Sequence, residues 1–332
     1  MNNLETKTQK INQSEENFNL EEIKEIYHKP LIELIHQAAE VHRNHFDPKA
    51  IQLCSLLSIK TGGCPENCSY CSQSAHHKTS LKPEDLKSMD EVLDMAKNAK
   101  QNGASRFCMG AAWRQVKDND DFDSVLEMIR NIRKENLESC VSLGMVTEEQ
   151  ALKLKEAGLT SYNHNLDTGS KYYDKVVTTR TYEDRLHTLK NIQKAGIKVC
   201  CGAIIGMGES DEDRVEFIYT ISNLEQPPES IPVNALVPIK GTGLENQNPV
   251  LIWDVIRMIA ALRIFLPTSI VRLSAGRANF SHAEQALCFL AGANSIFLGD
   301  KLLTTPNIAE TDDHDMLKIL GISGDKAVSL NQ

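Results

Sequence analysis

Three cysteines in the first quarter of the chain have the spacing of a metal-binding loop. Cys64, Cys68 and Cys71 form a C-x₃-C-x₂-C pattern. Three thiolates on so short a loop can bind one metal centre. Three sulfurs suit a cubane iron–sulfur cluster whose fourth iron stays open for a small molecule, whereas a structural zinc ion or a fully ligated cluster needs a fourth protein ligand. The pattern therefore predicts an iron–sulfur cluster with one open iron.

A zinc site is the alternative interpretation of the same loop. His76, His77 or a distant cysteine could supply the fourth ligand, because a C-x₂-C pair followed by a histidine is common in zinc-binding loops. In either case Gly62 and Gly63 allow the backbone to turn tightly, and Pro65 stiffens the loop. The spacing alone leaves both metals open.

Three more cysteines fall on three separate predicted strands, where they could form a second metal centre. Cys108, Cys140 and Cys200 lie at comparable depths, and the inward residues of a barrel form layers. Each of them taken alone could equally be a core residue, because cysteine is often buried as a small apolar side chain. Spacing cannot distinguish Cys200 from Cys201, because adjacent residues of a strand face opposite sides.

An alternation of β-rich and amphipathic segments has to position these cysteines. Several helical segments end at a glycine, as at Gly103 and Gly158, which is typical of helix C-termini. The alternation predicts an α/β fold in which a parallel sheet closes as a (β/α)₈ TIM-type barrel; an open, doubly wound sheet is the alternative. The predicted strands cover residues 51–59, 105–110, 138–143, 161–166, 197–206, 232–236, 269–274 and 295–298, and the predicted helices cover residues 90–102, 122–136, 148–157, 182–195, 211–224, 251–265 and 283–291.

We expect a single barrel domain over residues 20–306, with a flexible polar extension at residues 1–19 and a C-terminal tail at residues 307–332. The extension lacks the apolar core of a secretory signal and the arginine-rich composition of a transit peptide. Active sites of such barrels lie at the carboxyl ends of the strands, and the first cysteine loop directly follows the first predicted strand. That loop is therefore where a cofactor is expected to bind.

The composition is that of an ordinary globular protein, with 41% hydrophobic and 24% charged residues. A net charge of −9 argues against a nucleic-acid-binding surface, and no apolar stretch approaches the length that spans a membrane. The nine cysteines are an odd number without disulfide-framework spacing, which predicts a reduced, cytoplasmic protein. Cys54 and Cys288 have no comparable partners and are interpreted as core residues.

The first cysteine loop and seven further motifs resemble the biotin synthase family of radical S-adenosylmethionine (SAM) enzymes. The resemblance covers roughly residues 30–306, and it includes an aromatic residue, Tyr70, just before the last cysteine of the loop. Cys201 is a departure, because a small residue is expected there. The motifs occupy residues 46–48, 55–62, 106–113, 162–168, 178–182, 227–230 and 271–277.

The resemblance implies a homodimer of (β/α)₈ barrels that converts dethiobiotin to biotin with SAM, a 4Fe–4S cluster and an inner 2Fe–2S cluster. Cys64, Cys68 and Cys71 would hold the 4Fe–4S cluster, whose open iron binds SAM and cleaves it to a 5′-deoxyadenosyl radical. That radical removes hydrogen from unactivated carbons, a step carried by the cofactor rather than by an acid–base side chain. The protein would be a sulfurtransferase that receives electrons from a reducing protein of the flavodoxin or ferredoxin type.

The resemblance also implies four ligands for the 2Fe–2S cluster, which donates the inserted sulfur: Cys108, Cys140, Cys200 and Arg272. Residue type alone makes Arg272 a positive group that balances an anionic cluster, or a salt-bridge partner, because a protonated guanidinium has no lone pair for a metal. Only the resemblance makes Arg272 a ligand.

Three asparagines and one aspartate are candidates for holding small molecules. Asn163, Asn165 and Asp167 alternate along the predicted fourth strand, so all three are expected to face inward. By the resemblance, Asp167 would bind the SAM ribose, a role that an ionised carboxylate fills well. Asn163, Asn165 and Asn234 would bind the ureido ring of dethiobiotin. The alternative for each asparagine is a cap at a strand end.

Four further residues are candidates for SAM binding: Tyr70, Arg185, Gly206 and Gly208. Arg185 would pair with the SAM carboxylate, or else form a solvent-facing salt bridge. The glycine pair would let the backbone approach the adenine closely. Tyr70 would pack near the adenine or anchor the loop.

Two other functions stay open on the sequence alone. A related radical SAM enzyme could act on a different small substrate, with inner cysteines that hold no cluster. A zinc-stabilised barrel without redox chemistry would bind a ligand or a partner and leave SAM intact.

Overall fold

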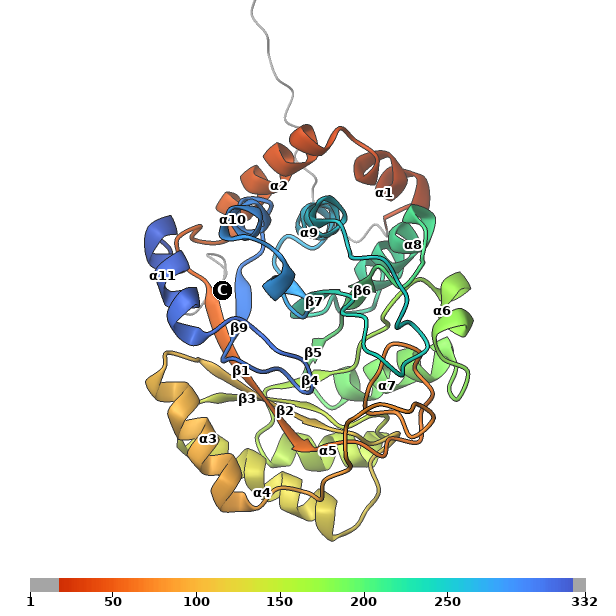
Figure 1. Ribbon diagram of the computed structural model, residues 1–332, viewed down its shortest axis with the longest axis vertical. Coiled ribbons are helices and arrows are strands. Elements are labelled where there is room, and N and C mark those ends of the chain that lie inside the picture. Colours follow the sequence, from red (N-terminus) through yellow and green to blue (C-terminus); the bar gives the residue numbers. More distant parts are fainter. Residues whose placement is uncertain (1–17, 325–332) are drawn as a thin grey trace, which may run out of the picture.

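A computed structural model describes residues 18–324, in which a parallel sheet lies inside a ring of helices (Figure 1). The strands pair in the order β5-β4-β3-β2-β1-β9-β8-β7-β6, and a further pairing of β5 with β7 closes the sheet. Only two residues separate β5 from β6, and both pair with β7, so they form one strand position. The barrel therefore has eight positions, which confirms the predicted (β/α)₈ fold. The strands are β1 (Gln52–Lys60), β2 (Arg106–Ala111), β3 (Glu138–Ser142), β4 (Ser161–Asn163), β5 (Lys198–Cys200), β6 (Ala203–Ile205), β7 (Ser230–Ala235), β8 (Ile270–Leu273) and β9 (Ser295–Leu298).

The seven predicted helices are all present between the strands, as expected of βα units. Five of these described helices begin with a capping box, in which a Ser or Thr side chain and the third helical residue satisfy each other's backbone N–H groups. The helices are α3 (Met89–Gln101), α4 (Asp120–Lys134), α5 (Glu148–Glu156), α7 (Tyr182–Lys194), α8 (Asp211–Ser222), α9 (Ile252–Phe265) and α10 (His282–Leu290).

Four described α-helices and one short 3₁₀ helix, at Arg277–Asn279, were not predicted. The α-helices are α1 (Leu20–Tyr27), α2 (Leu31–His45), α6 (Ser170–Val176) and α11 (Glu310–Leu320). α1 and α2 precede the barrel and lie against α8 and α9 (Figure 1). α6 has no side-chain cap, so its start carries no local signal. No helix within residues 18–324 has the length and apolar character needed to cross a bilayer.

The structure describes most of the expected C-terminal tail but little of the expected N-terminal extension. Residues 1–17 of the expected N-terminal extension lie outside the described residues. The expected C-terminal tail contains α11, whose buried Asp313 accepts a hydrogen bond from Arg277 Nη1 at 2.7 Å. This ion pair attaches the described part of the tail to the barrel.

The register of the strands brings cysteines that are far apart in the sequence onto neighbouring strands of the barrel. Cys108 on β2 is aligned with Leu56 on β1 and with Cys140 on β3. Cys200 on β5 is aligned with Asn163 on β4. Because side chains at one level of neighbouring strands point to the same face, the barrel interior collects residues that lie far apart in the chain.

The predicted fourth strand is too long. It was expected to reach residue 166, but β4 ends at Asn163, and Asp167 has a left-handed backbone with φ of 68°. Backbone hydrogen bonds hold that turn, because Asp167 N donates to Gly202 O at 3.1 Å and Ile204 N donates to Asp167 O at 2.8 Å. The expected alternation along a strand therefore does not explain how Asn165 and Asp167 face inward.

Candidate active site

One cavity of about 330 Å³ lies at the carboxyl ends of the strands and reaches both groups of cysteines. Barrels of this type carry their active sites at this end. We call residues 64–71 the outer cysteine loop, and Cys54, Cys108, Cys140 and Cys200 the inner cysteine set. The predicted metal ligands that line the cavity are Cys64, Cys68, Cys71, Cys108, Cys140, Cys200 and Arg272.

Backbone hydrogen bonds hold the outer cysteine loop in place. Cys64 N donates to Gln73 O at 2.9 Å, and Cys71 N donates to Cys68 O at 3.0 Å. Gly62, with φ of 71°, makes the turn that leads into the loop, as predicted. Burial raises the pKa of Cys71 to about 12 and also raises the pKa values of Cys64 and Cys68. The three thiols therefore have to lose protons before they bind a metal.

The geometry of the outer cysteine loop favours a cubane over a zinc ion. His76 Nε2 lies 3.1 Å from Pro65 O, and His77 Nε2 lies 2.9 Å from Cys68 O, so both rings contact backbone carbonyls. In a cubane each thiolate binds a different iron, so the three sulfurs do not have to meet at one point.

Arg180 supplies a positive charge at the outer cysteine loop, which sequence reasoning missed. Its Nη2 lies 3.8 Å from Cys68 Sγ, and its Nε is buried without a hydrogen-bond partner. An arginine beside a thiolate favours the charged form of the sulfur. The motif at residues 178–182 contains Arg180 and could have indicated that this arginine belongs to the site.

Asp167, Tyr70 and Arg185 come together as one buried group in the cavity wall. Asp167 Oδ2 accepts hydrogen bonds from the Tyr70 hydroxyl at 2.9 Å and from Arg185 Nη2 at 2.7 Å. Arg185 Nε also donates to the Tyr173 hydroxyl at 2.9 Å. Arg185 is 4% exposed, so the alternative of a solvent-facing salt bridge is wrong. Asp167 Oδ1 is buried without a partner, which fits a hydroxyl donor such as that of a ribose.

The three predicted asparagines all line the same cavity. Asn163 Nδ2 donates to Asn165 Oδ1 at 2.9 Å and lies 3.3 Å from Cys200 Sγ. Asn165 Oδ1 also accepts from Gly202 N at 2.9 Å, which leaves its amide nitrogen for a ligand. Asn234 donates to a backbone carbonyl at 3.0 Å and accepts from a backbone N–H at 3.2 Å. These contacts fix the orientation of all three amides.

Gly206 and Gly208 do not line the cavity. Both have left-handed backbones, with φ of 95° and 107°, so the turn after β6 needs glycine at these positions. A Cβ atom at Gly206 would clash with Val250. The Glu209 carboxylate holds the turn by accepting hydrogen bonds from Gly206 N at 2.9 Å and from Met207 N at 2.7 Å.

The inner cysteine set is buried inside the barrel with Phe297 and Leu302. Cys200 belongs to this set, whereas Cys201 packs in the main hydrophobic core, which settles the choice that spacing left open. Cys288 also packs in the main core, as interpreted. Cys54 is a buried core residue, as interpreted, but the expectation that it has no comparable partners is wrong, because its thiol lies among the other inner cysteines and 3.3 Å from Arg272 Nη2.

Two thiols of the inner cysteine set are poised to carry negative charge. Contacts with Cys108 and Cys200 hold the pKa of Cys140 well below its usual range. Burial opposes ionisation of Cys54, but the contact with Cys108 and the charge of Arg272 lower its pKa to about 6. The contacts with Cys140 raise the pKa values of Cys108 and Cys200. A buried cationic neighbour and four adjacent sulfurs fit an anionic iron–sulfur cluster.

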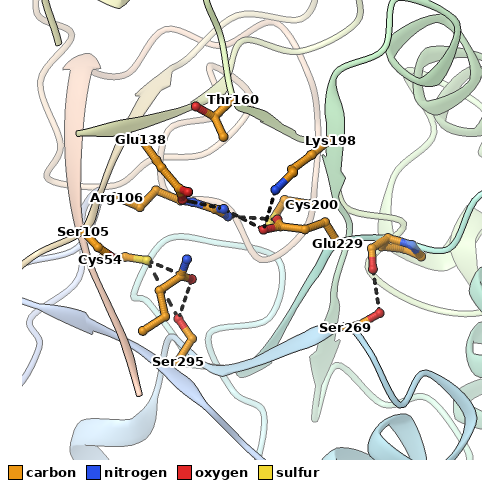
Figure 2. Close-up of polar contacts among 12 residues, drawn as sticks. Cys54, Ser105, Arg106, Glu138, Thr160, Lys198, Cys200, Glu229, Ser269 and Ser295 are labelled. Atoms are coloured by element: carbon orange, nitrogen blue, oxygen red, sulfur yellow. Dashed lines mark hydrogen bonds and ion pairs between the residues drawn. The ribbon is translucent and has the colours of Figure 1, made fainter. Parts of the chain in front are cut away.

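An ion-pair network closes the other end of the barrel, next to the inner cysteine set (Figure 2). Arg106 donates two hydrogen bonds to the Glu229 carboxylate, at 2.7 and 3.0 Å, and one to Glu138 at 3.0 Å. Lys198 lies 4.0 Å from Glu229. Sequence reasoning assigned no role to Arg106, although the motif at residues 106–113 begins with it.

A segment after β9 also reaches the cavity, a position that no sequence motif indicated. Residues 302–305 line the cavity wall. Thr304 Oγ1 lies 2.9 Å from Ser72 Oγ, which links this segment to the end of the outer cysteine loop. The cavity wall therefore contains residues from both the outer cysteine loop and the segment that follows β9.

The comparisons with known proteins agree with this arrangement. The chain matches the Radical SAM superfamily over residues 58–220 and the Biotin and Thiamin Synthesis associated domain over residues 232–323. The biotin synthase of Cytophaga hutchinsonii is 56% identical over 306 residues, which cover 92% of this chain and 91% of that protein. The biotin synthase of Gloeobacter violaceus is 56% identical over 301 residues, which cover 91% of this chain and 95% of that protein.

Two solved structures share the fold. Methylornithine synthase superimposes with a TM-score of 0.79 at 18% identity, over 94% of this chain and 95% of that chain. The FeFe-hydrogenase maturase of Carboxydothermus hydrogenoformans gives a TM-score of 0.79 at 19% identity, over 92% of this chain and 76% of that chain. At such low identity the likeness shows the fold alone.

Proposed function

This chain belongs to the biotin synthase family of the radical SAM superfamily, and from that premise we propose how its residues divide the family's reaction among themselves. The protein is a radical SAM sulfurtransferase that inserts sulfur into dethiobiotin to give biotin, with SAM, a 4Fe–4S cluster and a 2Fe–2S cluster as its cofactors. The observation that carries the proposed division is one cavity that connects the outer cysteine loop with the inner cysteine set.

The two groups of cysteines hold different cofactors. Cys64, Cys68 and Cys71 hold the 4Fe–4S cluster, and the nearby guanidinium of Arg180 balances its charge. When bound, this cluster and SAM supply a 5′-deoxyadenosyl radical that removes hydrogen atoms, and the inner cluster supplies the sulfur. The ligands proposed for the 2Fe–2S cluster are Cys108, Cys140, Cys200 and Arg272.

The buried group around Asp167 positions SAM. Asp167 Oδ1 accepts a hydrogen bond from a ribose hydroxyl, because this oxygen is buried without another partner. Tyr70 and Arg185 fix the carboxylate by donating to Oδ2. The remaining N–H groups of Arg185 are available to the SAM carboxylate. Gly206 and Gly208 lie outside the cavity wall and act on the adenine side only by shaping the turn that follows Ile204, which lines the cavity.

The three asparagines place dethiobiotin next to the inner cluster. A ureido ring presents both N–H donors and a carbonyl acceptor, which primary amides can match. Asn163 lies 3.3 Å from Cys200 Sγ, so a ring bound at Asn163 and Asn165 lies beside the sulfur source. Asn234 faces the same cavity from β7.

Turnover in oxygen-free conditions tests the proposed function. The full chain, reconstituted with iron and sulfide, is incubated with SAM, dethiobiotin and a reductant. Mass spectrometry is expected to find biotin together with 5′-deoxyadenosine. Deoxyadenosine without biotin would support a different substrate. A colourless protein that holds about one zinc and leaves SAM intact would overturn the iron–sulfur assignment altogether.

We further propose the setting in which the enzyme works: a cytoplasmic homodimer, with residues 20–306 as one catalytic domain, reduced by a flavodoxin- or ferredoxin-type protein. The single sheet supports the domain assignment, because strands from both matched segments pair within it. Light scattering on the purified holoenzyme tests the dimer, since a monomer mass would contradict it. Comparing both reductants in the biotin assay tests the electron donor.

A further inference from the structure

Cys54 belongs to the inner cysteine set, yet neither the motifs nor the proposed function uses it. Its thiol is fully buried and contacts the thiol of Cys108. Cys108 in turn contacts Cys140, and Cys140 contacts Cys200. Four thiols from four strands therefore form one continuous row. Four cysteine thiols are the ordinary ligand set of a 2Fe–2S cluster.

Arg272 links the two ends of this row. Its Nη2 lies 3.3 Å from Cys54 Sγ, and its Nη1 lies 4.0 Å from Cys200 Sγ. Its Nε donates to Ser295 Oγ at 2.9 Å, and Nη2 also donates to Gln52 Oε1 at 3.2 Å. In this arrangement the guanidinium acts as a hydrogen-bond donor and presents no lone pair to a metal. Figure 2 shows Cys54 and Ser295 together in the interior of the barrel.

We propose that Cys54 is a reserve thiol ligand of the inner cluster, which takes the fourth protein-ligand position of that cluster whenever Arg272 does not occupy it. A thiolate is the usual protein ligand of cluster iron, whereas a protonated guanidinium is a poor one. A site that must keep iron while sulfur leaves retains it better with a fourth thiol within reach. This inference rests on the proposed function, because it assumes that an inner cluster binds.

Variants at both positions test the inference in the reconstituted full-length enzyme. The set is wild type, C54S, R272M and C54S/R272M, with C201S as the matched control, because Cys201 is equally buried but packs in the main core. R272M keeps much of the side-chain volume, and thermal unfolding checks that each variant folds. The measurements are iron and sulfide per chain, the visible absorption spectrum and the reduction potential of the inner cluster.

R272M is expected to keep its inner cluster, at a lower reduction potential than wild type, because nitrogen ligands raise the potential relative to thiolates. C54S/R272M is expected to lose about two irons per chain relative to R272M. Equal iron content and equal spectra in R272M and C54S/R272M would overturn the inference, as would loss of the inner cluster in folded R272M.

A second measurement does not depend on the Arg272 variant. Iron is removed from wild type, C54S and C201S with a chelator, and C54S is expected to lose its inner iron several-fold faster than the other two. Identical rates in C54S and C201S would contradict the role of Cys54. Wild type that binds a 4Fe–4S cluster but no inner cluster would overturn the proposed function as well, so the two failures are distinguishable.

Discussion

The outer cysteine loop and the inner cysteine set, which we propose as ligands of two different clusters, are held in place in different ways. The outer cysteines lie within residues 64–71 and are ordered mainly by backbone hydrogen bonds. The inner cysteines come from four strands, contact one another and face Arg272. The outer thiols have raised pKa values, whereas two inner thiols have lowered ones. A loop thus leaves one side open for a small molecule, while a barrel interior surrounds its cluster with ligands and charge.

Removing one ligand from each region should remove one cluster and leave the other. Cys71→Ala is expected to lose about four irons per chain and Cys108→Ala about two, because the two regions share no ligand. Iron analysis and absorption spectra of anaerobic protein measure this. Cys201→Ala, with its thiol in the main core, is the control and keeps both clusters. Loss of both clusters in either folded variant would break the comparison.

The ion-pair network next to the inner cysteine set is expected to contribute to the stability of the fold. Glu229→Gln removes the negative charge and one of the two carboxylate oxygens that accept hydrogen bonds from Arg106, which is 1% exposed, and is expected to cost about 3 kcal/mol of unfolding free energy. Denaturant unfolding measures the loss. Lys198→Gln is the control, since an exposed pair at 4.0 Å contributes roughly 0–1 kcal/mol. Equal losses in both variants would show that Arg106 does not depend on Glu229.

Asp167→Asn should weaken SAM binding without emptying either cluster site. The change removes the charge that Arg185 and Tyr70 contact, and such charge-assisted hydrogen bonds contribute about 1.5–3 kcal/mol, so the KM for SAM is expected to rise roughly 10- to 100-fold. Tyr70→Phe removes one neutral donor and is expected to raise KM about fivefold. Iron content separates this effect from cluster loss. An unchanged KM in Asp167→Asn would exclude a ribose contact.

The two regions also differ in how well they could be predicted. The outer cysteine loop could be predicted because its three candidate ligands lie within eight consecutive residues, so their spacing alone indicates a metal site. The barrel could also be predicted from the sequence, because β-rich and helical segments alternate and capping residues such as Ser88 and Thr181 mark helix starts. What such signals share is that they act over a few residues.

Local sequence patterns could not predict the contacts of Cys54 or the orientation of the Asp167 side chain. Cys54 meets Arg272 across 218 residues, a contact that depends on the register of β1 and β8 through the intervening β9. Asp167 faces the cavity because of a left-handed turn that a non-glycine residue rarely adopts, so the expected strand alternation was wrong there. Both features follow from tertiary packing and have no local pattern.

A buried histidine in α2, outside both cysteine groups, provides a pH-dependent effect on stability. Burial, reinforced by the charge of Arg263, lowers the pKa of His42 to about 3. Below pH 6.5 the unfolded chain takes up a proton that the folded protein does not, so stability falls as pH falls. The contribution is about 2 kcal/mol between pH 7 and pH 5. His42→Leu should reduce the pH dependence of unfolding by this amount, and an unchanged dependence would contradict it.

The most direct test of the division between the two regions is to quantify 5′-deoxyadenosine and biotin together, by mass spectrometry, in Cys68→Ala and Cys140→Ala. Cys68→Ala is predicted to yield neither product, because the outer cluster is needed to cleave SAM. Cys140→Ala is predicted to retain deoxyadenosine formation but to yield no biotin. Parallel loss of both products in the two variants, with folding intact, would contradict separate roles for the outer cysteine loop and the inner cysteine set.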